Sequence, residues 1–258
     1  MNLTNIGWCD LTLNTATGCK HGCAYCYARR IASRFNGTKA WPNGFEPTFH
    51  PERLTEPGKV KKPSRIFVGS MGDLFGDWVP REWIERTLKM TQDYPWHTYI
   101  FLTKNPARYR EFSWPDNCWM GTSIENQEAA NERINSLLEA KALVKFLSIE
   151  PLLGPVNLTH VARLEKYPSY IDDVPDQWTF YDDALTGFRA HKAGGSYGPK
   201  ADWVIIGAQT GPGAVKPEPA WVESLIKQCR DANVPLFLKD NLHWPEIIQQ
   251  WPRAGDSR

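Results

Sequence analysis

The sequence has no long hydrophobic run and almost no net charge. Its longest apolar runs, such as 203–206 (WVII), are far too short to cross a bilayer. Residues 1–10 lack the charged and apolar regions of a secretory signal. A formal net charge of +1 provides no overall basic field that would favour or exclude nucleic acid. We therefore expect a soluble, cytoplasmic protein with no membrane part.

Cysteine is scarce, and half of it is concentrated in one place. Three of the six cysteines, Cys19, Cys23 and Cys26, have the spacing Cys-x3-Cys-x2-Cys. In a reducing compartment such clusters are more often metal ligands than disulfides. No fourth cysteine follows at a ferredoxin spacing, so three thiolates would hold a [4Fe–4S] cluster with one open iron. The alternative is a zinc site completed by Cys9 or His21, although the sequence has no second cysteine knuckle.

Short apolar segments alternate with helical patterns along most of the chain. Apolar strands without strict alternation are typical of a parallel sheet that is buried on both faces. We predict a single α/β domain over residues 1–258, a partial or closed (βα)6–8 barrel resembling a TIM barrel, with the cysteine loop after the first strand. The expected strands are 6–13, 65–70, 98–102, 118–123, 144–149, 203–207 and 235–238, and the expected helices include 27–35, 80–93 and 219–232.

Polar side chains follow the end of nearly every predicted strand. Active sites of βα barrels lie at the carboxyl ends of the strands, so this repetition predicts a lined site. The alternative is that strand ends simply become polar where they meet solvent. Lys104, Lys239 and Asp240 are the candidate catalytic residues. The polar pairs are Ser70/Asp73, Lys104/Asn105, Ser123/Glu125, Ser148/Glu150, Gln209/Thr210 and Lys239/Asp240.

One segment, at about 156–200, interrupts the alternation. It has no clear periodicity, and a loop this long within a compact domain is usually functional or disordered. Its aromatic content argues against disorder, so we expect an insertion at the rim that serves as a lid or substrate platform. The aromatic residues are Tyr167, Tyr170, Trp178, Phe180, Tyr181, Phe188 and Tyr197.

The cysteine motif, with Tyr25 directly before Cys26 and a helix after it, resembles that of the radical S-adenosylmethionine (SAM) superfamily. The resemblance implies a [4Fe–4S] cluster whose open iron binds the amino and carboxylate groups of SAM. An electron from the cluster then cleaves SAM to methionine and a 5′-deoxyadenosyl radical, which abstracts hydrogen from a substrate. A flavodoxin- or ferredoxin-like reductant is the implied partner.

A series of ordered motifs narrows the resemblance to the phage Gp37/Gp68 family, a domain of unknown function. This implies a radical-SAM-like protein that is often phage-encoded and would act in the cytoplasm of a bacterial host. The sequence departs from the family near its end, where residues 238–241 read Leu-Lys-Asp-Asn instead of Lys-Gln-Trp-Gly. The matching motifs are 7–10 (GWCD), 17–19 (TGC), 67–75 (FVGSMGDLF), 102–106 (LTKNP), 119–123 (WMGTS), 148–154 (SIEPLLG) and 202–207 (DWVIIG).

The resemblance also implies cofactor-binding roles for individual residues. Tyr25 would pack beside the cluster with its backbone in contact with adenine, and Asp73 would accept from the SAM ammonium group. Their alternatives are loop packing for Tyr25 and an ordinary turn for Asp73. Lys104 and Lys239 could neutralise a carboxylate or phosphate. The remaining assignments are Gly69, Ser70 and Met71 beside the amino group, Ser123, Glu125, Ser148 and Glu150 on the ribose or methionine carboxylate, and Gly207 with Gln209 on the adenine side.

Positive charge is concentrated in the first quarter of the chain and is interleaved with aromatics. This combination suits a DNA or RNA surface, although a solvated helix face has the same composition. We expect hydrogen abstraction from an unidentified substrate, with a phage DNA base or nucleotide as the candidate. The rival is a zinc- or cluster-stabilised nucleic-acid or protein-binding protein without turnover. The basic residues are Arg29, Arg30, Arg34, Lys39, Arg53, Lys59, Lys61 and Lys62, and the aromatics are Phe35, Trp41 and Phe45.

Overall fold

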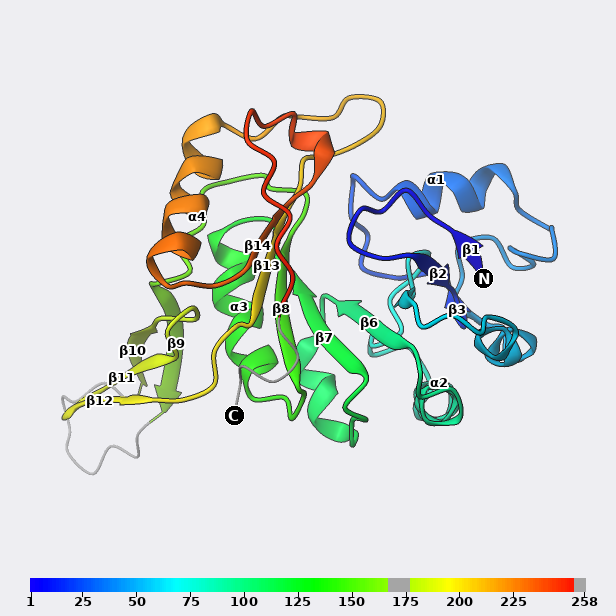
Figure 1. Cartoon of the computed structure of the whole chain (residues 1–258), viewed down its shortest axis with the longest axis horizontal. Helices are drawn as coiled ribbons and strands as arrows, with labels where there is room; N and C mark the ends of the chain where they lie inside the picture. Colours follow the sequence, from blue (N-terminus) through cyan, green and yellow to red (C-terminus); the bar gives the residue numbers. More distant parts are fainter. Residues whose placement is uncertain (167–176, 253–258) are drawn as a thin grey trace.

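The computed structural model describes residues 1–166 and 177–252, which form an eight-stranded sheet (Figure 1). The strand order is β1-β2-β5-β6-β7-β8-β13-β14. Only β1 (Asn2–Leu3) runs antiparallel, to β2 (Leu11–Leu13), and all the other described neighbours in this sheet are parallel. The other strands are β5 (Arg65–Val68), β6 (Thr98–Thr103), β7 (Cys118–Ser123), β8 (Val144–Ile149), β13 (Trp203–Ile206) and β14 (Leu236–Leu238). The predicted parallel α/β sheet is confirmed.

Three helices cover the outer face of this sheet. Buried side chains of α2 (Arg81–Asp93), α3 (Gln127–Leu138) and α4 (Pro219–Asp231) share one apolar core with outward-facing strand residues such as Val68 and Met120. Helix α1 (Tyr27–Arg34) lies apart from them (Figure 1). None of the described helices is long and apolar enough to span a membrane. The short 3-10 helices are Pro51–Thr55, Pro57–Lys59, Pro106–Glu111 and Asp240–Leu242, and β3 (Ala16–Thr17) pairs with β4 (Thr48–Phe49).

Side chains of each central strand alternate between two buried environments. In β7, Met120 packs in the outer core beneath the helices, whereas Trp119 belongs to a second, inner aromatic core. In β8, Leu147 faces outward and Phe146 inward. Because both faces are buried, apolar residues are favoured at successive positions. This explains why the strands appear in the sequence as continuous apolar runs.

The barrel is partial. β1 and β14 are the two ends of the strand order, and no described hydrogen bonds join them into a ring, so the closed alternative is wrong. Instead, the segment before β2 packs across the inner face, where Gly7 lies against the ring of Phe237 in β14. Trp8 packs on Phe67, with ring centroids 4.7 Å apart, and on Trp203 at 6.5 Å. The first strand is therefore shorter than the predicted 6–13.

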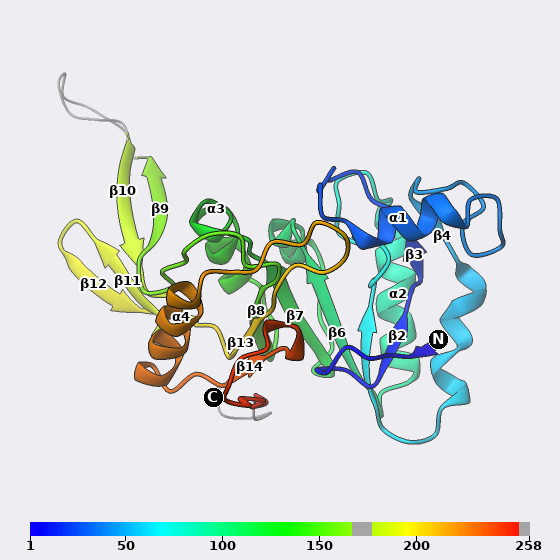
Figure 2. The same cartoon turned by 90° about the horizontal axis from the view of Figure 1, so that it is seen from above.

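The insertion consists of two hairpins in its described part. β9 (Val161–Lys166) pairs with β10 (Gln177–Asp182), and β11 (Phe188–His191) pairs with β12 (Gly194–Tyr197). The Ala162 N–H donates to Asn131 Oδ1 of α3 at 2.9 Å. Figures 1 and 2 show the hairpins at the opposite end of the molecule from α1. The predicted Tyr167 and Tyr170 lie outside the described residues.

Candidate functional site

A cavity of about 630 Å³ lies at the carboxyl ends of the parallel strands. This volume is within the range of roughly 300–1,000 Å³ that is typical of small-molecule sites. Described residues between 152 and 207 contribute nothing to its lining, and the expected role of the 156–200 segment as a lid or platform stays a prediction. The predicted residues that do line it are Cys19, Cys23, Tyr25, Cys26, Gly69, Ser70, Met71, Asp73, Lys104, Ser123, Ser148, Glu150, Gln209 and Lys239.

Strand alternation explains why these side chains meet. In β8, the inward-facing Phe146 belongs to the inner aromatic core, and Ser148 and Glu150 follow at two-residue steps along the same face. In β6, Leu102 packs against that core and Lys104 follows it. The inner face thus has an aromatic lower layer and a polar upper layer, and the polar layer forms the cavity.

The start of the cysteine loop is held between two backbone segments. Gly18 has φ +86° and donates its N–H to Met71 O at 3.0 Å. A Cβ at this position would lie 2.4 Å from Glu46 O, so only glycine fits. The next N–H, that of Cys19, donates to Phe45 O at 3.2 Å. The first cysteine is therefore held by backbone contacts to two segments that are distant from it in the sequence.

Two of the three thiols accept backbone N–H groups. His21 N lies 3.5 Å from Cys19 Sγ, and Arg29 N lies 3.4 Å from Cys26 Sγ, which caps α1. All three cysteines are free and half-buried. Burial raises the pKa of the Cys19 thiol to about 12, so a metal bound here would have to displace its proton. The N–H donors would stabilise the resulting thiolates.

Neither a zinc site nor a cluster site is assembled among the described residues. Among the described residues, no group of three or more His, Cys, Asp or Glu side chains is placed to hold a metal ion. Cys9 is buried in the inner core, and burial raises the pKa of its thiol to about 12. His21 turns its Nε2 to Asp73 Oδ2 at 2.8 Å. Neither candidate completes a tetrahedral site with the three cysteines.

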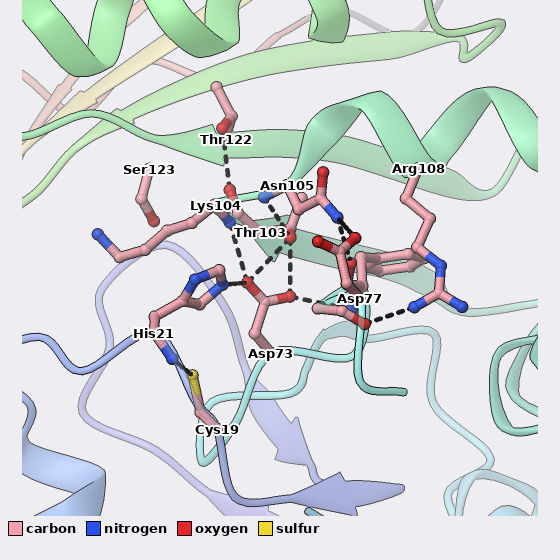
Figure 3. Close-up of polar contacts among 12 residues, drawn as sticks. Cys19, His21, Asp73, Asp77, Thr103, Lys104, Asn105, Arg108, Thr122 and Ser123 are labelled. Atoms are coloured by element: carbon pink, nitrogen blue, oxygen red, sulfur yellow. Dashed lines mark hydrogen bonds and ion pairs between the residues drawn. The ribbon is translucent and has the colours of Figure 1, made fainter. Parts of the chain in front are cut away.

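Asp73 is the centre of a dense hydrogen-bond network (Figure 3). Besides His21, it accepts from Thr103 Oγ1 at 2.7 Å, Phe75 N at 2.9 Å and Lys104 N at 3.0 Å. Burial alone would raise the pKa of this carboxyl, but the hydrogen bonds outweigh burial and lower it below the ordinary value. Asp73 therefore joins the cysteine loop to the ends of β5 and β6, and its expected acceptance from the SAM ammonium stays a prediction.

Tyr25, Lys104 and Glu125 form a second network. The Tyr25 hydroxyl donates to Glu125 Oε1 at 2.5 Å and accepts from Lys104 Nζ at 2.6 Å, and Lys104 also forms an ion pair with Glu125. Arg133 of α3, which sequence reasoning missed, binds Glu125 Oε2 at 2.9 Å. Burial lowers the pKa of Lys104. Glu125 is thus held behind Tyr25 and does not line the cavity itself.

Glu150 and Lys239 form an ion pair elsewhere in the cavity wall. Gly207 permits their approach, because a Cβ there would lie 2.9 Å from both Glu150 Cδ and Lys239 Cδ. Both predicted lysines are therefore paired with carboxylates. Asp240 does not line the cavity, and its Oδ1 accepts from Gln249 Nε2 at 3.1 Å.

The Ser148 hydroxyl is the polar group of the cavity wall that most clearly lacks a hydrogen-bond partner. It is buried, lines the cavity and has no hydrogen-bond partner among the described residues. Buried polar groups almost always have a partner, so a bound molecule is the natural source of one. The three free thiols beside the cavity are the donor type of an iron–sulfur cluster, and this hydroxyl suits a polar organic cofactor, although the thiols do not form a metal-binding group in this structure.

Comparison with known proteins places the chain in a family. The profile described as "Protein of unknown function (DUF5131)" matches residues 3–255. The chain belongs to this family. The description does not include the phage name suggested by the motifs, and no curated protein matches the chain.

Three solved structures of spore photoproduct lyase are similar to this DUF5131 protein at low identity. A double mutant with bound AdoMet and dinucleoside spore photoproduct has TM-score 0.43 and 10% identity, over 90% of this chain and 75% of that one. The complex with dinucleoside spore photoproduct has TM-score 0.38 and 11% identity, over 84% and 71%. A cysteine-to-serine mutant has TM-score 0.39 and 14% identity, over 58% of this chain and 48% of that one. TM-scores this low carry no functional argument.

The predicted nucleic-acid residues of this DUF5131 protein lie at two separate places. Arg29, Arg30 and Arg34 lie on α1, which begins at the cysteine loop beside the cavity. Lys61 and Lys62 lie three to four residues before β5 and thus near the amino edge of the sheet, opposite the cavity. The basic residues of the first quarter of the chain therefore do not all lie beside the cavity.

Proposed function

We propose that this protein is a radical SAM enzyme that abstracts hydrogen from an unidentified substrate, with a DNA base or nucleotide as the candidate class. One observation carries the proposal. Three cysteines without a fourth open into a cavity that is lined by polar residues from the carboxyl ends of the parallel strands. An incomplete thiolate set leaves a coordination position for an organic ligand, and the cavity has room for one.

Cys19, Cys23 and Cys26 would hold the [4Fe–4S] cluster. When reduced by a flavodoxin- or ferredoxin-like partner, the cluster would supply the electron that cleaves SAM and so starts hydrogen abstraction. The chain's contribution is geometric. His21 and Asp73 fix the loop against β6, and backbone N–H groups at Cys19 and Cys26 offset the thiolate charge.

Two parts of the wall would bind SAM. The oppositely charged pair Glu150 and Lys239 suits the ammonium and carboxylate of its methionine end. The unpartnered Ser148 hydroxyl would bind the ribose or the carboxylate. Tyr25, held by Lys104 and Glu125, would contact adenine. Gly69, with φ +92°, leaves the backbone after β5 open to close approach.

Anaerobic reconstitution tests the proposal. The wild-type chain should bind about four irons in one cluster and release 5′-deoxyadenosine from SAM on chemical reduction. Cys26→Ala should lose both, whereas Cys229→Ala, which removes a buried thiol of α4 far from the loop, should keep both. A colourless protein that holds one zinc per chain, with no SAM cleavage, would support the binding-protein alternative instead.

The substrate class has its own test. Deuterium-labelled DNA and deoxynucleotides are supplied to the reconstituted enzyme, and 5′-deoxyadenosine is analysed by mass spectrometry. Transfer of deuterium identifies the hydrogen donor directly. Robust SAM cleavage without deuterium transfer from any of them would exclude nucleic acid and nucleotides while leaving the enzyme class intact.

A further inference from the structure

The chain around the cysteine loop contains no acidic residue. From 11 to 45 there is no Asp or Glu, while Lys20, Arg29, Arg30, Arg34 and Lys39 are present. The rest of the sequence has 25 Lys and Arg against 29 Asp and Glu. The charge of this segment is therefore opposite in sign to that of the remaining chain.

These charges lie on the solvent side of the cysteine loop. Lys20 directly follows Cys19, and Cys26 caps the helix that carries Arg29 and Arg34. All five basic side chains are exposed. Figures 1 and 2 show α1 at the outside of the molecule, apart from α2, α3 and α4. A partner approaching this helix would thus come close to the thiolates.

Few carboxylates neutralise these side chains. Lys20 forms a 3.4 Å ion pair with Glu46, but both side chains are more than half exposed, so the pair is weak. In residues 1–166 and 177–252, no recorded ion pair joins Arg29, Arg34 or Lys39 to a carboxylate. Arg29 instead lies over Phe45 and Arg34 over Phe35. The charge remains available to a partner.

The same face carries an exposed aromatic side chain. Phe35 is 45% exposed and lies between Arg34 and Lys39 in the sequence. Aromatic and arginine side chains are the types enriched at protein interfaces. Arg30 and Tyr27 belong to the cavity side, because Arg30 Nη2 lies 3.3 Å from Thr210 O and Tyr27, which lines the cavity, donates its hydroxyl to Ser70 O. The α1 face therefore consists of Lys20, Arg29, Arg34, Phe35 and Lys39.

We propose that the α1 face is the docking surface for an acidic electron-donor protein. The inference rests on the proposed function, because an electron donor is needed only if the loop holds a reducible cluster. In the complex the donor's reduced flavin or iron–sulfur centre loses one electron and the cluster gains it, with no bond made or broken. Opposite charge would steer the encounter and set its orientation.

The charge distribution favours a protein donor over nucleic acid. A strand delivering a base to the cavity would be expected to meet positive charge on both sides of the mouth. On the β13 side, residues 207–218 contain one lysine, Lys216, and one acid, Glu218, and Lys239 is already paired with Glu150. The basic surface is confined to the side of the cysteine loop.

Charge reversal tests this surface. Arg34→Glu with Lys39→Glu changes the α1 face at positions away from the thiolates, and Lys61→Glu with Lys62→Glu makes the same charge change at the amino edge of the sheet. 5′-Deoxyadenosine formation is measured with two reductants, an acidic bacterial flavodoxin reduced by its NADPH-dependent reductase, and photoreduced deazaflavin, which needs no docking.

With flavodoxin at low salt, the α1 variant should be slower than wild type by about tenfold, and the difference should shrink above about 0.15 M salt. Its deazaflavin-driven rate and the behaviour of the Lys61/Lys62 variant should match wild type.

Equal slowing of both variants, no slowing, or a wild type that flavodoxin cannot reduce would overturn the inference. Loss of DNA binding with an unchanged flavodoxin-driven rate would assign the face to nucleic acid. If deazaflavin gives no product with wild type, it is the proposed function that fails.

Discussion

A single carboxylate fixes the cysteine loop to the sheet. Asp73 binds His21 from the loop, Phe75 from its own turn, and Thr103 and the Lys104 N–H from the end of β6. Each of these donors is left without its acceptor if the carboxylate is lost, and unsatisfied buried donors are costly. The position of the first thiol therefore depends on a residue that is 54 positions away in the sequence from Cys19.

Replacing this carboxylate should weaken both stability and iron binding. Asp73→Asn keeps the shape but cannot accept from all four donors, so we expect a loss of about 1–3 kcal/mol in the free energy of unfolding. The reconstituted variant should also hold less iron per chain. Asp77→Asn is the matched control, because Asp77 is exposed and accepts from Asn105 Nδ2 at 2.7 Å. Equal iron content in Asp73→Asn and wild type would contradict the positioning role.

Gly207 is a second position where neighbouring atoms leave no room for a side chain. Adding a Cβ would separate Glu150 from Lys239, because both side-chain Cδ atoms lie 2.9 Å from its position. Gly207→Ala should therefore cost about 1–3 kcal/mol in stability and weaken SAM binding measured by equilibrium dialysis. Gly154→Ala adds the same methyl group where the nearest atom, Asn126 Cβ, is 3.4 Å away, and should leave SAM binding unchanged. Wild-type affinity in Gly207→Ala would show that the ion pair does not bind SAM.

At the scale of elements, ion pairs join the two hairpins of the insertion to each other and to α3. Asp182, which is 3% exposed, binds Arg163 Nε at 2.6 Å and lies 3.5 Å from Arg189 Nε. Arg189 in turn lies 3.9 Å from Glu139 at the end of α3. The hairpins are thus held to each other and to α3, on the side of the sheet away from the cavity.

This arrangement predicts a change in stability without a change in chemistry. Asp182→Ala removes the buried carboxylate from Arg163, which keeps its ion pair with Glu165 and its hydrogen bond to Ala190 O, so we expect a loss of about 1–3 kcal/mol in the free energy of unfolding. Chemical denaturation should detect this loss. In the same variant, iron content and 5′-deoxyadenosine formation per folded chain should equal those of wild type. A proportionate loss of SAM cleavage would mean that the insertion is coupled to the cavity after all.

Across the whole molecule, local patterns were the predictable part. The apolar runs of β5, β6, β7, β8 and β13, and the cysteine spacing, depend on neighbouring residues, so the sequence alone indicated them. Pairings between distant positions were not predictable, such as Tyr25 with Glu125 or Glu150 with Lys239. The polar strand ends indicated which residues meet, because parallel strands end at one edge. They did not indicate that each lysine there has a carboxylate partner.

The hairpins were missed for a physical reason. Strand prediction depends on an alternation between a buried and an exposed face, and in β12 all four residues, Gly194–Tyr197, are exposed. Without a buried face, β12 has no pattern to detect, whereas β10 does alternate, with Phe180 and Asp182 buried. The sequence also could not predict whether the barrel is partial or closed, because the number of βα units does not determine whether the edge strands meet.

A final prediction concerns the cooperation of cluster and cofactor in the folded molecule. If SAM binds through the open iron as well as the cavity wall, its affinity should depend on the cluster. At a SAM concentration of 100 times its dissociation constant, the holoprotein should gain about 2.7 kcal/mol. For a chain of this size that corresponds to a rise in Tm of roughly 5–10 °C, measured by anaerobic calorimetry. Cluster-free protein and Cys26→Ala should show little rise at the same concentration, because both lack the iron ligand. An equal rise in all three samples would mean that SAM occupies the cavity without the cluster, and would separate cofactor binding from the cysteine loop.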